Sequence, residues 1–148
     1  MQNETVLNQL QFLLGTLRDG KKGFADAAAH ATSPDLAQLL TARSEQRGTF
    51  ERQIAEQITA LGGKPDQHSS LGAALHRTWL NIRDALSGRD DHAVLAECVR
   101  GEGVAVENFT DVLSEMELPA DLRALIQHQF AAVKESHTQL LDMQNQVG

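Results

Sequence analysis

Apolar residues recur at alternating spacings of three and four positions along most of this chain, and that spacing constrains the fold more than any other feature. It places the apolar side chains on one stripe of an α-helix. Chain breakers are few and fall at four places: Thr32-Ser33-Pro34, Gly62-Gly63-Lys64-Pro65, Ser87-Gly88-Arg89-Asp90 and Glu117-Leu118-Pro119. An aromatic content of 4% argues against sheets. The sequence therefore predicts an all-α protein.

The breakers divide the chain into five predicted helices, spanning about 4–31, 34–61, 70–87, 91–116 and 119–146. Ser33 is suited to cap the second helix, with Pro34 at its first position. Asp90 or Asp91 is the predicted cap of the fourth helix, and Pro119 begins the fifth. The boundaries therefore follow from ordinary capping chemistry.

Four of the predicted helices contain about 26–28 residues and would be roughly 40 Å long, which suggests one bundle. The first and second helices, like the fourth and fifth, are joined by connections of two or three residues and must form antiparallel hairpins. The segment 62–90 is too long for a turn and can run back along the bundle. We therefore predict a single domain over 1–148, a ferritin-like up-down-down-up four-helix bundle whose long crossover carries an additional helix.

The first predicted helix has a second face, opposite its leucine stripe, formed by Phe12, Gly15, Asp19 and Gly23. Glycines there would let another helix approach closely. His76 and Trp79 of the crossover helix are the candidates to cover this face, which could instead face solvent or another subunit. Asp19, His76 and Trp79 could also form a site for a small molecule or a partner, although a polar contact that docks the crossover helix is the favoured interpretation.

Charged and polar residues interrupt the apolar stripes. Counting outwards from the predicted loops places five of them in one layer near the middle of the bundle, with His137 about a turn away: Asp19, Lys21, Arg43, Arg47 and Glu102. A charge inside a core is costly unless it is paired. We therefore predict an internal ion-pair layer that sets the helix register, in which Glu102 bridges Arg43 or Arg47.

Di-metal carboxylate bundles use the same location for a different purpose. They need a carboxylate from each of two helices and a Glu-x-x-His pair from each of the other two. No glutamate of this chain is followed by histidine three positions later, and two arginines and a lysine would repel a cation. No metal is therefore favoured. The alternatives are a degenerate iron or manganese site of Asp19, Glu102 and His137, and a surface position for some of these residues.

The charge balance and the cysteine content limit the partners and the compartment. A net charge of −7 excludes a nucleic-acid backbone as the expected partner, because phosphate binding needs a concentrated basic surface. No apolar stretch approaches the ~18 residues that span a bilayer. The lone Cys98 cannot form an internal disulfide and is expected to be a buried, inert thiol, and the N-terminal residues lack a signal-peptide pattern. We expect a cytoplasmic protein.

Several segments carry a family resemblance: Leu17-Arg18-Asp19-Gly20 with Gly23-Phe24, Ala42-Arg43 with Arg47 and Phe50, Leu61-Gly62-Gly63 with Pro65, Leu75-His76-Arg77 with Trp79, and Arg100-Gly101-Glu102 with His137. Together they resemble a bacterial family of ferritin-like four-helix-bundle proteins of unknown function. The most specific pieces are His76-Arg77-Thr78-Trp79 and Gly101-Glu102.

This resemblance covers nearly the whole chain and implies the ferritin-like fold and a homo-oligomer, such as a dimer. It brings no established activity or ligand. We therefore expect a non-enzymatic structural or interaction protein and, by analogy with neighbouring ferritin-like groups, a role in stress physiology. The alternative is a metal-binding protein or oxidase with a reduced ligand set.

Overall fold

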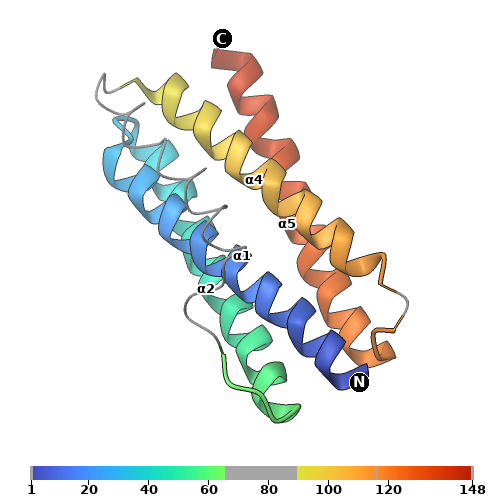
Figure 1. Cartoon of the computed structure of the whole chain (residues 1–148). Coiled ribbons are helices and arrows are strands. Elements are labelled where there is room, and N and C mark those ends of the chain that lie inside the picture. The colour runs from blue at the N-terminus through green and yellow to red at the C-terminus, as the bar shows by residue number, and fades with distance from the viewer. Residues whose placement is uncertain (1, 66–89, 116, 148) are drawn as a thin grey trace.

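The computed structural model describes residues 2–65, 90–115 and 117–147 (Figure 1). These ranges contain four α-helices and no strand: α1 (Gln2–His30), α2 (Pro34–Ala60), α4 (Asp91–Leu113) and α5 (Ala120–Val147). The all-α prediction is confirmed. The predicted helix over 70–87, with His76 and Trp79, lies outside the described residues.

Helices that follow each other in the chain pack against each other as pairs. α1 and α2 pack closely as one antiparallel hairpin and α4 and α5 as another, and α1 also packs against α4 (Figure 1). A hydrogen bond from Asn108 Nδ2 to Thr16 Oγ1, at 3.0 Å, joins the facing sides of α4 and α1. No helix within the described ranges is long and apolar enough to cross a membrane.

The helix ends follow local capping chemistry. The Ser33 hydroxyl accepts a hydrogen bond from the Leu36 amide at 3.3 Å, and the Asp90 carboxylate accepts one from the His92 amide at 2.9 Å. Both predicted caps are confirmed. After α2, Gly62 adopts a φ of 87°, a conformation that favours glycine, and the Gly63 amide donates to the Ile58 carbonyl at 2.9 Å.

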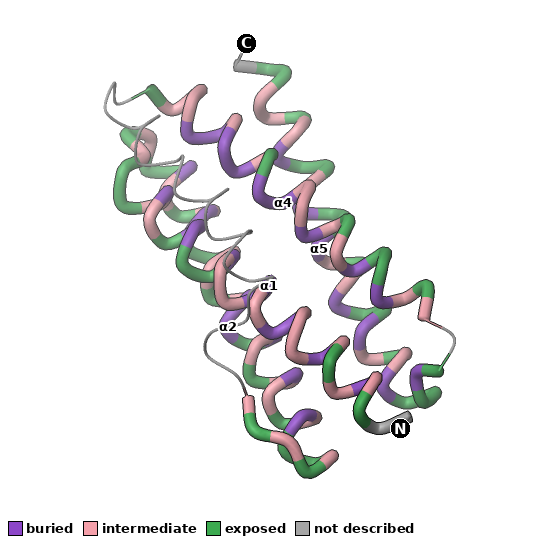
Figure 2. The backbone as a smooth tube through the Cα atoms, viewed as in Figure 1, coloured by how far each residue is buried: buried purple, intermediate pink, exposed green. Residues whose placement is uncertain are grey.

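The buried side chains form two apolar clusters along the bundle, on the inward faces of the helices (Figure 2). The larger cluster includes Leu10, Leu14, Ile54, Phe109 and Ile126. The smaller cluster lies nearer the C-terminal end of α1 and includes Phe24, Leu36, Leu40, Leu95, Cys98 and Leu140. On α2 and α4, Arg47 and Glu102 fall between the residues of one cluster and those of the other, so a polar group separates them.

Asp91, the first residue of α4, forms hydrogen bonds with the loop between α1 and α2. Its carboxylate accepts bonds from the Thr32 amide at 2.8 Å, the Thr32 hydroxyl at 2.9 Å and the Ser33 amide at 2.9 Å. Desolvation raises the pKa of Asp91, but these three bonds outweigh it, and the net effect is a pKa below the usual value. The charged carboxylate therefore holds the two hairpins together at this end.

We expect Asp91→Asn to lower the free energy of unfolding at pH 7 by about 1–2 kcal/mol, because the charge-assisted bonds between the hairpins are lost or weakened. Since the folded-state pKa of Asp91 is lowered, its contribution is complete above about pH 4 and is lost as the pH falls through the folded-state value. Urea denaturation of wild type and Asp91→Asn from pH 7 to pH 3 measures this difference, which should narrow in acid.

The matched control for Asp91 is Asp121→Asn, which changes an exposed carboxylate in the first turn of α5. That variant should differ from wild type by only a few tenths of a kcal/mol. A difference between wild type and Asp91→Asn that stays constant over the whole pH range would contradict the proposed role of the charged carboxylate.

Candidate functional site

The most deeply buried charges of the described chain belong to an ion pair between α2 and α4. Arg47 Nη2 lies 2.6 Å from Glu102 Oε2, and the two side chains are 2% and 1% exposed. The ring of Phe24, from α1, lies under the guanidinium, with its centroid 5.3 Å from Arg47 Cζ. Three helices thus enclose one charged contact that water does not reach.

Two further side chains extend this contact to α5. Ser136 Oγ donates to Glu102 Oε2 at 2.6 Å, and Arg43 Nε donates to Ser136 Oγ at 3.0 Å. Arg43 Nη2 also bonds Gln139 Oε1. We call Arg43, Arg47, Glu102 and Ser136 the polar network. It links α2, α4 and α5 through directional hydrogen bonds, and a shift of any of these helices along its axis would break at least one of them.

The electrostatics of the polar network reflect burial. Burial raises the pKa of Glu102, and the charge of Arg47 and the bond from Ser136 partly oppose this. Burial lowers the pKa of Arg47, and the charge of Glu102 opposes this. An arginine side chain keeps its proton in proteins, and a contact of 2.6 Å is typical of a charge-assisted bond. The pair is therefore ionic, and each charge depends on the other.

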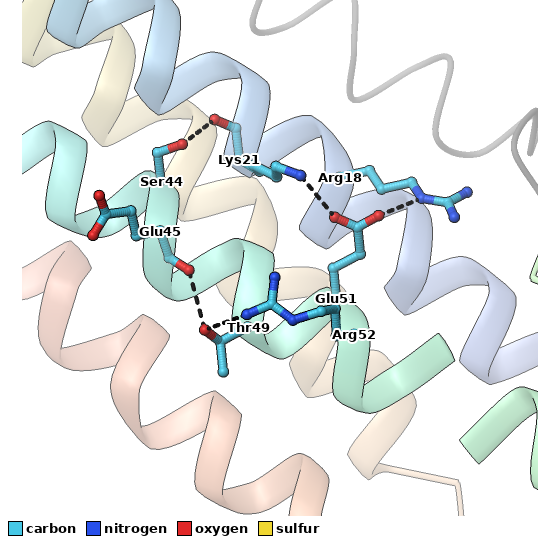
Figure 3. Close-up of polar contacts among 7 residues, drawn as sticks. All are labelled: Arg18, Lys21, Ser44, Glu45, Thr49, Glu51 and Arg52. Carbon is cyan, nitrogen blue, oxygen red and sulfur yellow. Dashed lines mark hydrogen bonds and ion pairs between the residues drawn. The ribbon is translucent and has the colours of Figure 1, made fainter. Parts of the chain in front are cut away.

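Lys21 does not belong to the core, which corrects the prediction that placed it in the internal layer. Its side chain is 53% exposed, and Nζ lies 3.6 Å from Glu51 Oε1. Arg18 Nε reaches the other oxygen of Glu51 at 2.7 Å, so Arg18 and Lys21 of α1 meet one carboxylate of α2 at the surface (Figure 3). The physical reason is the flexible lysine stem, which passes close to Gly48 and carries the ammonium group to water.

The remaining residues predicted for the layer have different surroundings. Asp19 is half-buried on α1, and burial raises its pKa to about 6 although Lys22 acts in the opposite direction. His137 is half-buried and lies against α4, where a Cβ built on Gly103 would be 3.4 Å from its Nε2. Its charge is one of the influences that lower the pKa of Glu102. His76 and Trp79 lie outside the described residues.

Ser136 is the member of the polar network that sequence reasoning missed. The sequence pattern placed His137 about a turn from the internal layer and did not single out Ser136. A stripe of threes and fours admits Ser136 equally well, since it follows Val133 by three positions and precedes Leu140 by four. The structure buries Ser136, with 1% exposure, and leaves His137 half-exposed. Ser136 could have been recognised in the sequence as a small hydroxyl residue on the apolar stripe of this helix, able to bond a buried carboxylate.

The donors needed for a metal centre do not gather in the described ranges. No three side chains of His, Cys, Asp or Glu there could together hold a metal ion. Asp19, Glu102 and His137 thus do not make a three-ligand group. Cys98 is a buried free thiol, and burial and the charges of Glu102 and Glu97 raise its pKa well above the usual value. The arrangement suits a locked helix contact better than ligand exchange.

Comparison with known proteins identifies the family. None of the curated proteins matches the sequence. Residues 5–115 match the family model described as a domain of unknown function, DUF2383. The matched range contains most of α1 and all of α2 and α4, with Arg47 and Glu102, and it ends before α5. Since the match covers well over half of the sequence, the chain belongs to the DUF2383 family of domains of unknown function.

Proposed function

We propose that this protein is a non-enzymatic structural or interaction protein, whose helices are held in register by a buried ion pair in place of a di-metal site. One observation carries the proposal: Arg47 and Glu102 pair at 2.6 Å with almost no exposure. The guanidinium supplies the positive charge that a buried carboxylate requires. A metal ion beside it would be repelled, so the pair and a metal centre are alternatives for one position.

The topology of this proposal is the ferritin-like up-down-down-up order, with the segment between α2 and α4 as a crossover that carries an additional helix. Two antiparallel hairpins support it, together with the bonds from Thr32 and Ser33 to Asp91. These bonds place the start of α4 beside the end of α1. The end of α2 and the start of α4 therefore lie at opposite ends of the bundle, as the long crossover of ferritin-like bundles requires (Figure 1).

The groups beside the polar network that could act as nucleophiles support a non-enzymatic role. A nucleophile must be reached by its substrate and activated by a base or a lowered pKa. Ser136 is 1% exposed and Cys98 is 0% exposed, and the thiol pKa of Cys98 is raised. Neither group can meet a substrate without opening the bundle.

Metal analysis separates this proposal from the alternative of an iron- or manganese-binding protein or oxidase. The protein is purified without chelator or histidine tag and analysed by inductively coupled plasma mass spectrometry. We expect far less than one iron or manganese ion per chain, in wild type and in Glu102→Gln alike. Glu107→Gln, an exposed change on the same helix, serves as the control. Stoichiometric iron or manganese in wild type that Glu102→Gln removes would overturn the proposal.

A further inference from the structure

A positively charged pocket lies on the surface between α1 and α2. It holds about 380 Å³ and is lined by Arg18, Lys21, Lys22 and Ala25 of α1 and by Ser44 and Glu51 of α2. Three of these six residues are cations and one is a carboxylate, whereas the whole chain has a net charge of −7. A hollow lined by charges of one sign raises the local concentration of oppositely charged small molecules. This pocket therefore attracts anions although the protein as a whole is acidic.

The carboxylate of this pocket is shared between two cations. Arg18 Nε lies 2.7 Å from Glu51 Oε2, whereas Lys21 Nζ lies 3.6 Å from Glu51 Oε1 and its side chain is 53% exposed (Figure 3). Because the closer contact belongs to Arg18, Glu51 compensates the charge of Lys21 only in part. Lys22 is exposed and acts on the pKa of Asp19, yet it forms no ion pair within the described ranges. Two lysine ammonium groups can therefore bind an anion from solvent.

Arg52 adds a further positive charge beside the pocket. The side chains of Lys21 and Arg52 reach the same place on α2, since a Cβ built on Gly48 would lie 3.6 Å from Lys21 Cδ and 3.8 Å from Arg52 Nη1. Arg52 Nη2 donates to the Thr49 hydroxyl at 3.2 Å, and Arg52 forms no ion pair in the part of the chain that the structure describes (Figure 3). Neighbouring cations repel each other, and a bound anion offsets that repulsion.

Carboxylates border this positive surface along both helices. Asp26 follows Lys22 by four positions on α1, and Glu56 follows Arg52 by four positions on α2. Residues four apart are neighbours on the surface of a helix. An extended polyanion, such as a nucleic-acid strand, would meet these carboxylates and be repelled, whereas a small anion contacts the pocket alone. The charge pattern therefore favours a small ligand.

A phosphate group matches this pocket in charge and in size. At pH 7 a phosphate monoester carries a charge of about −1.5 to −2 and three strong acceptor oxygens, more than one carboxylate offers. The volume of the pocket lies within the range of small-molecule sites. Its two walls are joined, because the Ser44 hydroxyl donates to the Lys21 carbonyl at 2.8 Å (Figure 3). We propose that this pocket binds the phosphate group of a small molecule, with Lys21 and Lys22 contacting its oxygens and Arg52 adding positive charge.

An NMR titration of the full chain tests the phosphate site. Sodium phosphate, adenosine monophosphate and adenosine are added separately at constant ionic strength, and the backbone amide signals are followed. We expect saturable shifts around Lys21, Lys22 and Ser44 with the two phosphate compounds and none with adenosine. Equal affinities for the two compounds would identify free phosphate as a sufficient ligand, and tighter binding of adenosine monophosphate would identify a phosphate ester.

Two variants change the affinity in opposite directions. The double variant Lys21→Gln with Lys22→Gln should weaken phosphate binding by about tenfold or more, because two cations are lost. Glu51→Gln should tighten it several-fold, because a competing carboxylate is removed. The matched control is Lys64→Gln with Lys134→Gln, which removes the same charge from exposed lysines elsewhere and should change the affinity by less than about twofold.

The outcomes separate the alternatives. Phosphate shifts that do not saturate would overturn the proposal, and so would equal phosphate affinities in wild type and the Lys21 and Lys22 double variant, or a Glu51→Gln variant that binds no tighter. A glutamate-rich peptide that shifts the same signals when phosphate does not would make this surface a protein contact and would also overturn it. If circular dichroism shows that the double variant does not fold, Arg52→Gln takes its place, and the wild-type titration decides independently.

Discussion

Replacing Glu102 with alanine is expected to lower the free energy of unfolding by about 3–5 kcal/mol. Glu102 is 1% exposed and accepts bonds from Arg47 and Ser136, so its removal leaves a buried guanidinium without its counter-charge. The cost is the desolvation of that unpaired charge more than the loss of one contact. Urea denaturation followed by circular dichroism measures the change.

Two comparisons make the Glu102 result specific. Glu107→Ala removes an exposed carboxylate from the same helix and should change stability by no more than about 0.5 kcal/mol. The double variant Arg47→Met with Glu102→Leu removes both charges and keeps the volume, so it should recover most of the loss and could exceed wild type. A loss below about 1 kcal/mol for Glu102→Ala would mean that bulk water reaches the pair and that it does not set the helix register.

Phe24→Ala is expected to cost a similar amount, about 3–5 kcal/mol. Phe24 is fully buried in the smaller apolar cluster, and its ring also lies under the Arg47 guanidinium at 5.3 Å. The substitution therefore leaves a cavity and also removes the aromatic face that stabilises a desolvated cation. Thermal and urea unfolding measure the loss, and Phe24→Leu, which keeps most of the volume, should lose less.

The control for Phe24 is Phe130→Ala, because Phe130 is only half-buried and stacks against Phe109 at a centroid distance of 6.2 Å. Phe130→Ala should lower the free energy of unfolding clearly less than Phe24→Ala does. A double-mutant cycle between Phe24→Ala and Arg47→Met should give a coupling energy of about 0.5–2 kcal/mol. Additive losses would show that the ring contributes only its volume, and the cation contact would then have no energetic role.

The helix boundaries were predictable because they depend on residues that are close in sequence. Ser33 and Asp90 cap the next helix through their own side chains, and glycines end α2. The burial of Arg47 and Glu102 was also predictable, since both interrupt an apolar stripe at helical spacing. The pattern did not decide whether Glu102 pairs with Arg43 or with Arg47. The short contact of Arg47 with Glu102 depends on how far apart α2 and α4 lie.

The differences between prediction and structure have separate causes, and the first is that a stripe of threes and fours often admits either of two adjacent residues. Ser136 and His137 are both compatible with the stripe of α5, and only the neighbouring carboxylate of Glu102 selects Ser136. Lys21 falls on a stripe, yet its stem is long enough to reach water and Glu51. The bonds from Thr32 and Ser33 to Asp91 join residues almost sixty positions apart, which no local pattern indicates.

For the residues that the structure describes, the sequence by itself determined four α-helices with approximate bounds, and it identified two opposite charges that lie in the core. Periodicity and capping are local, so they are readable without the fold. The tertiary structure alone decided that Phe24 covers Arg47, that Ser136 completes the network and that the Gln129 amide bonds Gln53. These contacts depend on the distance and rotation between helices, and those follow from the packing of all the side chains together.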